Sequence, residues 1–317
     1  MNKKVVVFGG GTGISYLLRG LKCFPVDITA VISVSDDGSS TGKLREEFLM
    51  PAVGDIRNAI VSLSDANDKI KDLLQYRFDT YTDLNGHPIG NLIMVGMYNM
   101  TGSLKESIKT LSDFLNVRHK ILPISEDYLT LLAETESGEI IRGESEIGHS
   151  GKPSKKIYYD ENPVIDKEVI DEILSADLIV FSIGSLFTSI VPNLLSSEVI
   201  EAIDKSKAKL LYTCNAVCQM GETEDFTCAD HVSAINSYLG KRKVEAVIVS
   251  DSKIPKDILD KYVSAENKKL VKCDASRLKE MRCKVIKQDL LVIENNYIRH
   301  DNLKFATAIF NYLIGVI

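Results

Sequence analysis

The sequence predicts an α/β fold of the three-layer α/β/α, Rossmann-like type, with a mostly parallel sheet, a helical segment and a small β-hairpin excursion. Two observations support this prediction. Apolar runs of strand length recur along the chain, and most lead through a polar loop into apolar residues at helical spacing, the pattern of βαβ units. These runs are almost continuously apolar, as expected for parallel strands covered on both faces.

Composition limits the possible functions. The chain has 317 residues, of which 44% are apolar and 26% charged, so residues 1–317 are expected to form a single α/β domain. The formal net charge is −6 and the basic residues are scattered, so no nucleic acid partner is expected. The apolar runs are too short for a membrane span. Six cysteines without a CxxC pair, and an N-terminus that does not resemble a signal peptide, favour a cytoplasmic protein.

The N-terminal segment predicts a strand, a tight turn and a helix. Residues 5–8 are apolar and are closed by glycines, and residues 14–21 have apolar side chains at helical spacing. Residues 27–34 are rich in Ile and Val, predict the next strand, and end in a polar loop at residues 35–42. A strand, a helix and a strand at this spacing favour two parallel strands.

The middle of the chain changes character twice. Residues 55–114 carry apolar side chains at helical spacing and predict a helical segment. Residues 129–133 and 139–142, joined by Glu136-Ser137-Gly138, predict a β-hairpin. Residues 117–160 are therefore expected to form an excursion from the main sheet.

The remaining chain returns to the alternation of strands and helices. Its predicted strands are residues 178–183, 209–213, 245–249, 270–273 and 290–294. Its clearest predicted helices are residues 166–174 and 302–313.

Four loops that leave predicted strands share one composition. They are rich in Gly, Ser, Thr, Asn and acidic residues, and they are residues 9–13, 35–42, 184–189 and 215–223. Ligands of an open parallel sheet bind beyond the carboxyl ends of its strands, so these loops are expected to surround a binding cleft.

The first loop suits a phosphate. Glycines at 9–11 and at 13, before a helix, allow close backbone approach and present N–H donors at the positive end of the helix dipole, although a purely structural turn is the alternative. Ile14 does not supply the third glycine of a dinucleotide-binding fingerprint, so a nicotinamide or flavin cofactor is not supported. Residues 38–43 resemble a phosphate-binding P-loop but are one residue short, and Leu44 replaces its hydroxyl residue.

Two adjacent carboxylates and one arginine allow more than one interpretation. Asp36 and Asp37 end a predicted strand, where they could coordinate a divalent cation, accept a ligand hydroxyl or cap the next helix. Arg57 lies at the start of a predicted helix, and its planar guanidinium suits a phosphate, with a surface ion pair as the alternative. The remaining titratable candidates, interpreted as loop histidines, are His87, His119 and His149.

Cys214, Cys218, Cys228 and His231 combine ligand types that zinc prefers. Their spacing is not one of the standard ligand pairs, so buried or partly buried thiols are the favoured interpretation.

Ordered motifs run through nearly the whole chain. Residues 9–13 match GGGTG, residues 35–45 match SDDGGSSGRLR, residues 52–58 match PPGDIRN, residues 182–195 match GPGSLYTSxxPNLL, residues 215–223 match NxMTQPGET, and residues 299–301 match RHD. In these motifs the sequence resembles the gluconeogenesis-factor family, the bacterial relatives of 2-phospho-L-lactate transferase. Departures from these patterns include Ser39 for Gly, Ala52-Val53 for Pro-Pro, Ser182-Ile183 for Gly-Pro, and Cys218 and Met220 for Thr and Pro.

The resemblance implies a Rossmann-like domain that binds a nucleotide, with UDP-sugars such as UDP-N-acetylglucosamine as ligands. It also implies a regulatory role in growth on gluconeogenic carbon sources, cell shape and cell-wall precursor supply. The transferase relatives instead use magnesium, a lactyl-diphospho-guanosine donor and a deazaflavin acceptor. A nucleotide-sugar sensor that needs no cofactor is the favoured hypothesis, and a magnesium-dependent phosphotransferase is the alternative. A regulatory protein partner and a homodimer are expected from the resemblance and the fold class.

The two hypotheses draw on one set of residues, and neither assigns a catalytic residue. In the sensor hypothesis, residues 10–13 hold the diphosphate, Thr188, Asn193 and Asn215 orient the sugar, and Tyr262 and Arg299 close the site. In the transferase hypothesis, Asp36 and Asp37 hold magnesium and Arg57 neutralises charge. The full set is Gly10, Gly11, Thr12, Gly13, Asp36, Asp37, Lys43, Arg57, Asn58, Asn91, Gly184, Ser185, Thr188, Asn193, Asn215, Gln219, Glu222, Thr223, Tyr262 and Arg299.

Overall fold

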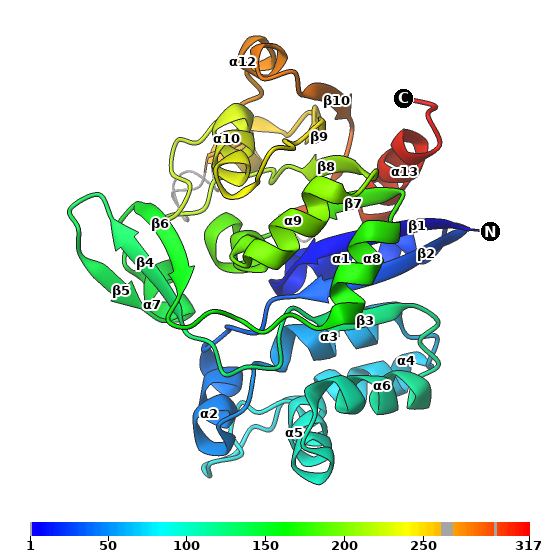
Figure 1. The fold of residues 1–317 in the computed structure, drawn as a ribbon, viewed down its shortest axis with the longest axis vertical. Coiled ribbons are helices and arrows are strands. Elements are labelled where there is room, and N and C mark those ends of the chain that lie inside the picture. Colours follow the sequence, from blue (N-terminus) through cyan, green and yellow to red (C-terminus); the bar gives the residue numbers. More distant parts are fainter. Residues whose placement is uncertain (1, 261–268, 295–296) are drawn as a thin grey trace.

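A seven-stranded parallel sheet forms the centre of the molecule (Figure 1). The computed structural model describes residues 2–260, 269–294 and 297–317. From one edge to the other, the strands are β10 (Lys284–Gln288), β9 (Ala246–Ser250), β8 (Lys209–Thr213), β7 (Leu178–Phe181), β1 (Lys3–Gly9), β2 (Val26–Ile32) and β3 (Lys120–Pro123). The predicted α/β class with parallel strands is confirmed.

The strand order reverses its direction between β1 and β7. From β1 the chain proceeds through β2 to β3 at one edge, and from β7 it proceeds through β8 and β9 to β10 at the other. Such a switch point leaves a crevice at the carboxyl ends of the two central strands, where ligands of open α/β sheets bind. The loops that follow β1 and β7 are therefore the first place to look for a site.

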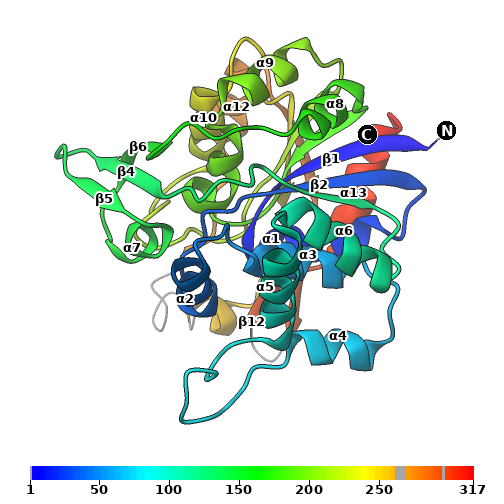
Figure 2. The same cartoon turned by 60° about the horizontal axis from the view of Figure 1, so that its bottom comes forward.

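Helices cover both faces of the sheet. Figure 2 shows α8 (Lys167–Ser175) and α9 (Ser197–Lys205) on one side of the strands, and α1 (Gly11–Leu21) and α3 (Gly54–Leu63) on the other. The last helix, α13 (Asn302–Leu313), packs against α1. The strands are buried on both faces as a result, which explains why β1 and β7 are apolar at consecutive positions.

The predicted helical segment inserts between β2 and β3. Besides α3 it contains α4 (Asp68–Gln75), α5 (Ile89–Thr101) and α6 (Leu104–Phe114), and α2 (Ser39–Phe48) precedes the predicted range. Side-chain caps begin two of these helices: Asn67 accepts from the backbone of α4, and Ser103 from that of α6.

A second sheet of three antiparallel strands lies between β3 and β7 in the chain. It consists of β4 (Leu131–Thr135), β5 (Ile140–Arg142) and β6 (Ser154–Tyr159), and a short helix, α7 (Glu144–His149), follows β5. The predicted hairpin corresponds to β4 and β5. The range expected for the excursion, 117–160, also contains β3, which pairs with β2 in the main sheet. Strand β6 was not predicted, because it begins with Ser-Lys-Lys and only its end is apolar.

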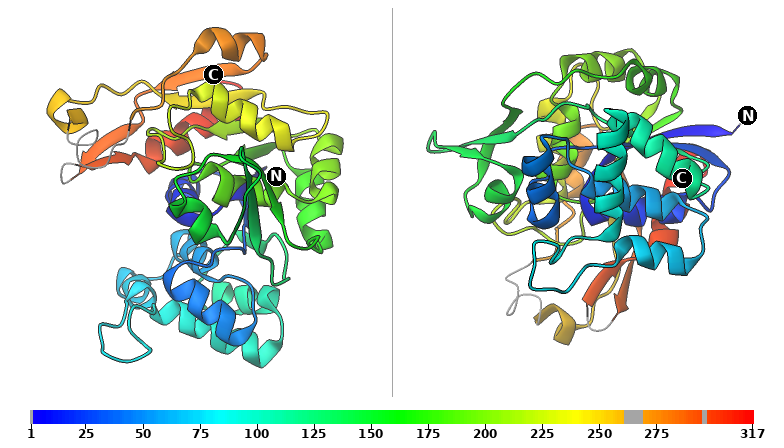
Figure 3. Two further views of the ribbon diagram at one scale, coloured as in Figure 1. Left: turned by 90° about the vertical axis from the view of Figure 1, so that its left-hand side faces the viewer. Right: turned by 90° about the horizontal axis from the view of Figure 1, so that it is seen from below.

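The C-terminal part differs more from the prediction. Residues 270–273 are not a strand, since only Leu270 pairs, in an isolated bridge with Val217. Strand β11 (Leu291–Glu294) forms an antiparallel hairpin with β12 (Tyr297–His300) instead of joining the main sheet, and Figure 3 shows this hairpin in orange and red, projecting from the body of the molecule. The main-sheet strand β10 was missed because Lys284, Lys287 and Gln288 interrupt its apolar pattern.

Within the described ranges, no single helix has the length and apolar character needed to cross a membrane. One pair, Leu186–Leu194 and Ser197–Lys205, meets the criterion only when its two parts are joined across a bend of 75°.

Candidate functional site

A cleft of about 550 Å³ lies at the switch point between β1 and β7. Of the predicted site residues it brings together Gly11, Thr12, Gly13, Gly184, Ser185, Thr188, Asn215, Gln219 and Arg299. Its other lining residues include Tyr16, Glu144, Ser189 and His300, which the sequence reasoning did not select. Three of the four loops expected to surround a cleft therefore contribute to this one.

The loops after β1 and β7 touch each other, and this contact explains two of the glycines. A Cβ atom on Gly13 would lie 2.1 Å from the Ile183 carbonyl oxygen, and one on Gly9 would lie 2.1 Å from Ser182 Oγ. Gly11 has a φ of +63°, a conformation that residues with side chains rarely adopt. The glycine run is thus required by packing and backbone conformation as well as suited to a phosphate.

The Asp55 carboxylate already accepts a hydrogen bond from one of the backbone N–H groups that were predicted to bind a phosphate. Its Oδ2 accepts from the Gly11 backbone N–H at 2.5 Å, at the N-terminus of α1. Burial, and next the nearby Asp36 carboxylate, raise the pKa of Asp55 to about 7. A carboxylate that is only partly ionised at neutral pH therefore sits against the glycine loop.

Four carboxylates, those of Asp36, Asp37, Asp55 and Glu144, lie close to one another, and of the four only Glu144 is among the residues that line the cleft. Asp37 Oδ1 accepts from the Ser145 backbone N–H at 2.7 Å and so caps α7, which Figure 2 shows next to α2. Burial is the main cause that raises the pKa of Glu144 well above its usual value, and the charges of Asp36, Asp55 and Asp37 add to it. Burial likewise raises the pKa of Asp36. The predicted capping of the next helix by Asp37 is therefore wrong, because Asp37 caps α7 and α2 begins without a side-chain cap.

The ligand types of this cluster fit a magnesium site, but their geometry does not provide a complete one. Carboxylate oxygens are the ligands that magnesium prefers, and a cation would relieve the repulsion that raises these pKa values. Among the described residues, however, no three acidic, histidine or cysteine side chains stand in ligand geometry. Magnesium is commonly held by one or two carboxylates together with phosphates and water, and Asp36 and Asp55 fit that mode.

The loop after β7 is held by the loop after β8. The Asn215 side chain accepts from the Gly184 N–H at 2.9 Å and donates to the Gly184 carbonyl at 2.7 Å. Glu222 Oε1 accepts from Ser185 Oγ at 2.5 Å and from the Phe187 N–H at 2.6 Å, and burial raises the Glu222 pKa. These two side chains fix the conformation of the turn that lines the cleft.

Several predicted residues lie away from the cleft. Asn193 is fully buried, with Nδ2 donating to the Gly9 and Ser189 carbonyls, so it supports the loops from beneath. Thr223 is also buried, and its Oγ1 accepts from the Gln219 N–H. Lys43, Arg57, Asn58 and Asn91 belong to α2, α3 and α5, and they do not line the cleft. Tyr262 lies outside the described residues.

Glu144 and His300 are the main functional candidates that the sequence did not reveal. Glu144 opens α7, where an acidic residue is usual for helix stability alone. His300 ends β12, and burial lowers its pKa to about 4, so its imidazole is neutral at physiological pH. The RHD motif was the only signal for His300, and the signal available for Glu144 was its position after the predicted hairpin.

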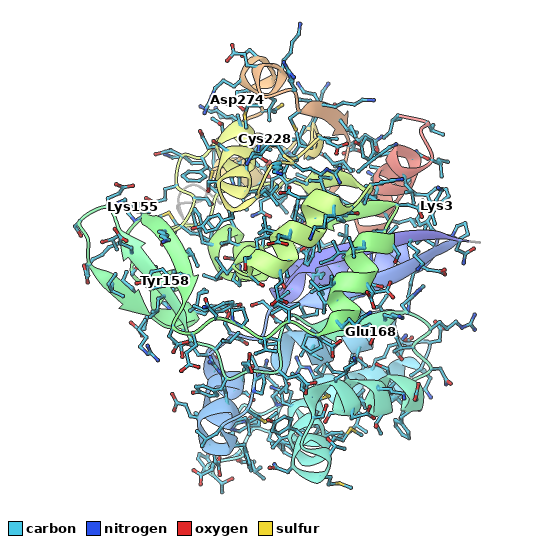
Figure 4. All side chains as sticks on the ribbon, viewed as in Figure 1. Lys3, Lys155, Tyr158, Glu168, Cys228 and Asp274 are labelled. Carbon is cyan, nitrogen blue, oxygen red and sulfur yellow. The ribbon has the colours of Figure 1, made fainter. Side chains whose placement is uncertain are left out.

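Of the cysteine group, Cys218 lines the cleft, whereas Cys214, Cys228 and His231 do not. Figure 4 shows Cys228 beneath Asp274 in the region of α10 (Cys228–Tyr238). Cys214, Cys218 and Cys228 are buried, and burial raises the pKa of the Cys218 thiol. His231 Nδ1 forms a hydrogen bond of 3.0 Å with the Thr227 carbonyl oxygen. These contacts are those of buried side chains in a core.

Comparisons with known proteins identify the family of the chain and agree with its fold. The model of the family described as 2-phospho-L-lactate transferase CofD matches residues 5–291. The chain is 43% identical to the gluconeogenesis factor of Bacillus subtilis, with 98% of each chain covered, and 38% identical to that of Listeria monocytogenes, with 98% of this chain and 95% of the relative covered. A crystal structure of a UPF0052 family protein from Bacillus halodurans superimposes with a TM-score of 0.92 at 40% identity, covering 97% of this chain and 99% of that one.

Matches of this length and identity show that the chain belongs to the CofD family and, within it, to the gluconeogenesis factors.

Proposed function

We propose that the cleft binds a nucleoside diphosphate, specifically a nucleotide sugar of the UDP-N-acetylglucosamine type, and that the protein acts as a regulator that senses it. The observation that carries the proposal is the cleft itself, whose volume of about 550 Å³ lies within the range of small-molecule sites, roughly 300–1,000 Å³. It is bordered by the N-terminus of α1 and by small polar side chains.

Each part of such a ligand has a counterpart in the cleft. The N-terminus of α1, at residues 11–13, offers a positive helix dipole to a diphosphate. Thr188 and Gln219 line the cleft and provide side chains able to hydrogen-bond hydroxyl groups of a ribose or a sugar. Tyr16, also in the lining, presents an aromatic face.

The magnesium-dependent phosphotransferase remains a second candidate because of the four carboxylates. In that function Asp36 and Asp55 would hold the cation, which would offset negative charge on the phosphates. Sensing is favoured because the curated relatives at about 40% identity are named gluconeogenesis factors. A regulator also requires a protein partner, and we propose that a partner responds to the loaded state.

Calorimetric titration with UDP-N-acetylglucosamine, GDP and NADH, each with and without magnesium, tests the proposal. Thr12 is exposed in the cleft, so Thr12→Val changes a lining hydroxyl at little risk to folding. Thr110→Val, on the exposed face of α6, is the matched control. We expect selective binding of the UDP-sugar, weakened by Thr12→Val and not by Thr110→Val.

The same samples distinguish the two functions. If the UDP-sugar binds and ³¹P NMR shows it unchanged after hours with magnesium, sensing is supported. If a nucleotide is consumed in the presence of magnesium, or if GDP binds selectively, the transferase function is supported and the sensing function is not. Failure of all three nucleotides to bind would refute both.

A further inference from the structure

A second group of polar side chains lies between α2, α3 and α5, apart from the cleft. Ser40, Arg57, His87 and Asn91 are each at most 6% exposed. Ser40 Oγ lies 2.8 Å from His87 Nδ1 and accepts from Asn91 Nδ2 at 3.2 Å, so three of the four are directly connected. None of them is among the described residues that line the cleft.

Arg57 is the unusual member. It is 5% exposed, and its one hydrogen bond among the described residues goes to the neighbouring Asn58 Oδ1 at 2.6 Å. The Nε and Nη1 groups have no acceptor, and Asn91 Oδ1 has no donor. An unpaired guanidinium buried in a protein costs several kcal/mol unless an anion accompanies it.

Further positive charges surround this group. Arg77 is near enough to add positive charge beside Arg57, and the Asp55 carboxylate opposes it only in part. Burial lowers the pKa of His87, assisted by Lys43 and Arg77, and only partly opposed by Glu47. Lys43 and Arg77 are exposed, so they provide a positive approach to the buried arginine.

A glycine keeps the arginine in place. A Cβ atom on Gly90 would lie 2.6 Å from Arg57 Cδ and 3.0 Å from its Cγ. The stem of Arg57 therefore passes directly against the backbone that precedes Asn91. The position of the guanidinium is set by packing, as expected for a side chain whose head must meet a ligand.

From this geometry we propose that Arg57, His87 and Asn91, with Lys43 and Arg77 at the entrance, form a second binding site for an oxyanion, carried by a phosphate or a carboxylate group. The planar fork of Arg57 has unpaired donors at Nε and Nη1, and Nη2 keeps a second hydrogen beside its bond to Asn58, so a charged, planar group of donors is available to these anions. This site is separate from the nucleotide cleft and does not depend on what the cleft binds. It allows the protein to take up a second anionic ligand.

Titration of the full chain with inorganic phosphate, and separately with acetate, at low ionic strength tests the proposal and identifies which group is preferred. Arg77→Ala and Lys43→Ala are expected to weaken binding by roughly two- to fivefold each, as for exposed charges. Arg57→Lys keeps the charge but loses the fork, and we expect a loss of at least about tenfold. Arg118→Ala, whose side chain is 83% exposed elsewhere, is the matched control.

Phosphate could also bind at the glycine loop, and Thr12→Val separates the two places. Binding that responds to Arg77→Ala and Lys43→Ala but not to Thr12→Val supports the second site. Binding that responds to Thr12→Val alone, equal binding by all variants, or no saturable binding of either anion would overturn it. The exposed variants answer the question even if Arg57→Lys fails to fold.

Discussion

Replacing Asp55 with asparagine should make the protein more stable at alkaline pH. Asparagine keeps an oxygen that can accept from the Gly11 N–H but removes the charge. The pKa of Asp55 is raised from 3.8 to about 7 in the folded state. Between these values the folded state binds a proton that the unfolded state has lost, so the stability of the parent falls as the pH rises and levels off above about 7.

The size of the effect follows from the same values. The interval from pH 5 to the pKa of the folded state is roughly two pH units. Each unit changes the free energy of unfolding by at most about 1.36 kcal/mol, so the upper limit of the change is about 2.7 kcal/mol. Asp55 is half-buried rather than fully buried, and solvent reduces this figure. We expect the advantage of Asp55→Asn over the parent to grow by about 1–2 kcal/mol between pH 5 and pH 8.

Urea denaturation at several pH values measures this difference, with Asp83→Asn, an exposed change in the loop before α5, as control. A parent and an Asp55→Asn variant that respond to pH in parallel would refute the electrostatic account of this cluster. Repeating the series with magnesium extends the test. If the cation binds here, it stabilises the parent more than the variant at pH 8.

Two further predictions concern the backbone of the cleft. Gly13→Ala should lower the free energy of unfolding, measured by urea denaturation, by about 2–4 kcal/mol, because its Cβ would lie 2.1 Å from the Ile183 carbonyl oxygen. Gly96→Ala lies in α5, and its Cβ would have no atom within 4 Å. This substitution should raise the free energy of unfolding by up to about 1 kcal/mol. Comparable effects of the two substitutions would contradict the packing argument. Asn215→Leu should lose about 2–3 kcal/mol of stability by leaving both backbone groups of Gly184 unpaired, and an unchanged urea midpoint would show that the clamp is dispensable.

The central strands could be predicted because their physical cause is local. Parallel strands buried on both faces must be apolar at every position, and residues 5–8 and 178–181 are. In the edge strand β10, Lys284 and Lys287 flank the two apolar residues, so the sequence contains no continuous apolar run that would predict a strand. The loops of the cleft were predictable because ligands of this sheet type bind at the carboxyl ends of strands.

The carboxylate cluster could be predicted only in part. Asp36 and Asp37 stand out as a pair after a strand, but Asp55 and Glu144 each begin a helix, where acidic residues are common for other reasons. Their meeting depends on how α3 and α7 are placed by the sheet and by the insertion. The same holds for Ser40 and His87, which are 47 residues apart in the chain.

The contact between Gly9 and Ser182 constrains the order in which these positions can change. Ser182 stands where the family pattern has glycine, and its hydroxyl occupies the space that any side chain at position 9 would need. Alanine at position 9 should therefore be far less costly after Ser182→Gly than before it, a case of epistasis that a double-mutant cycle measures directly. In this chain the serine raises the cost of replacing the first glycine of the loop, so an evolutionary route through Gly9 is easier once Ser182 has been lost.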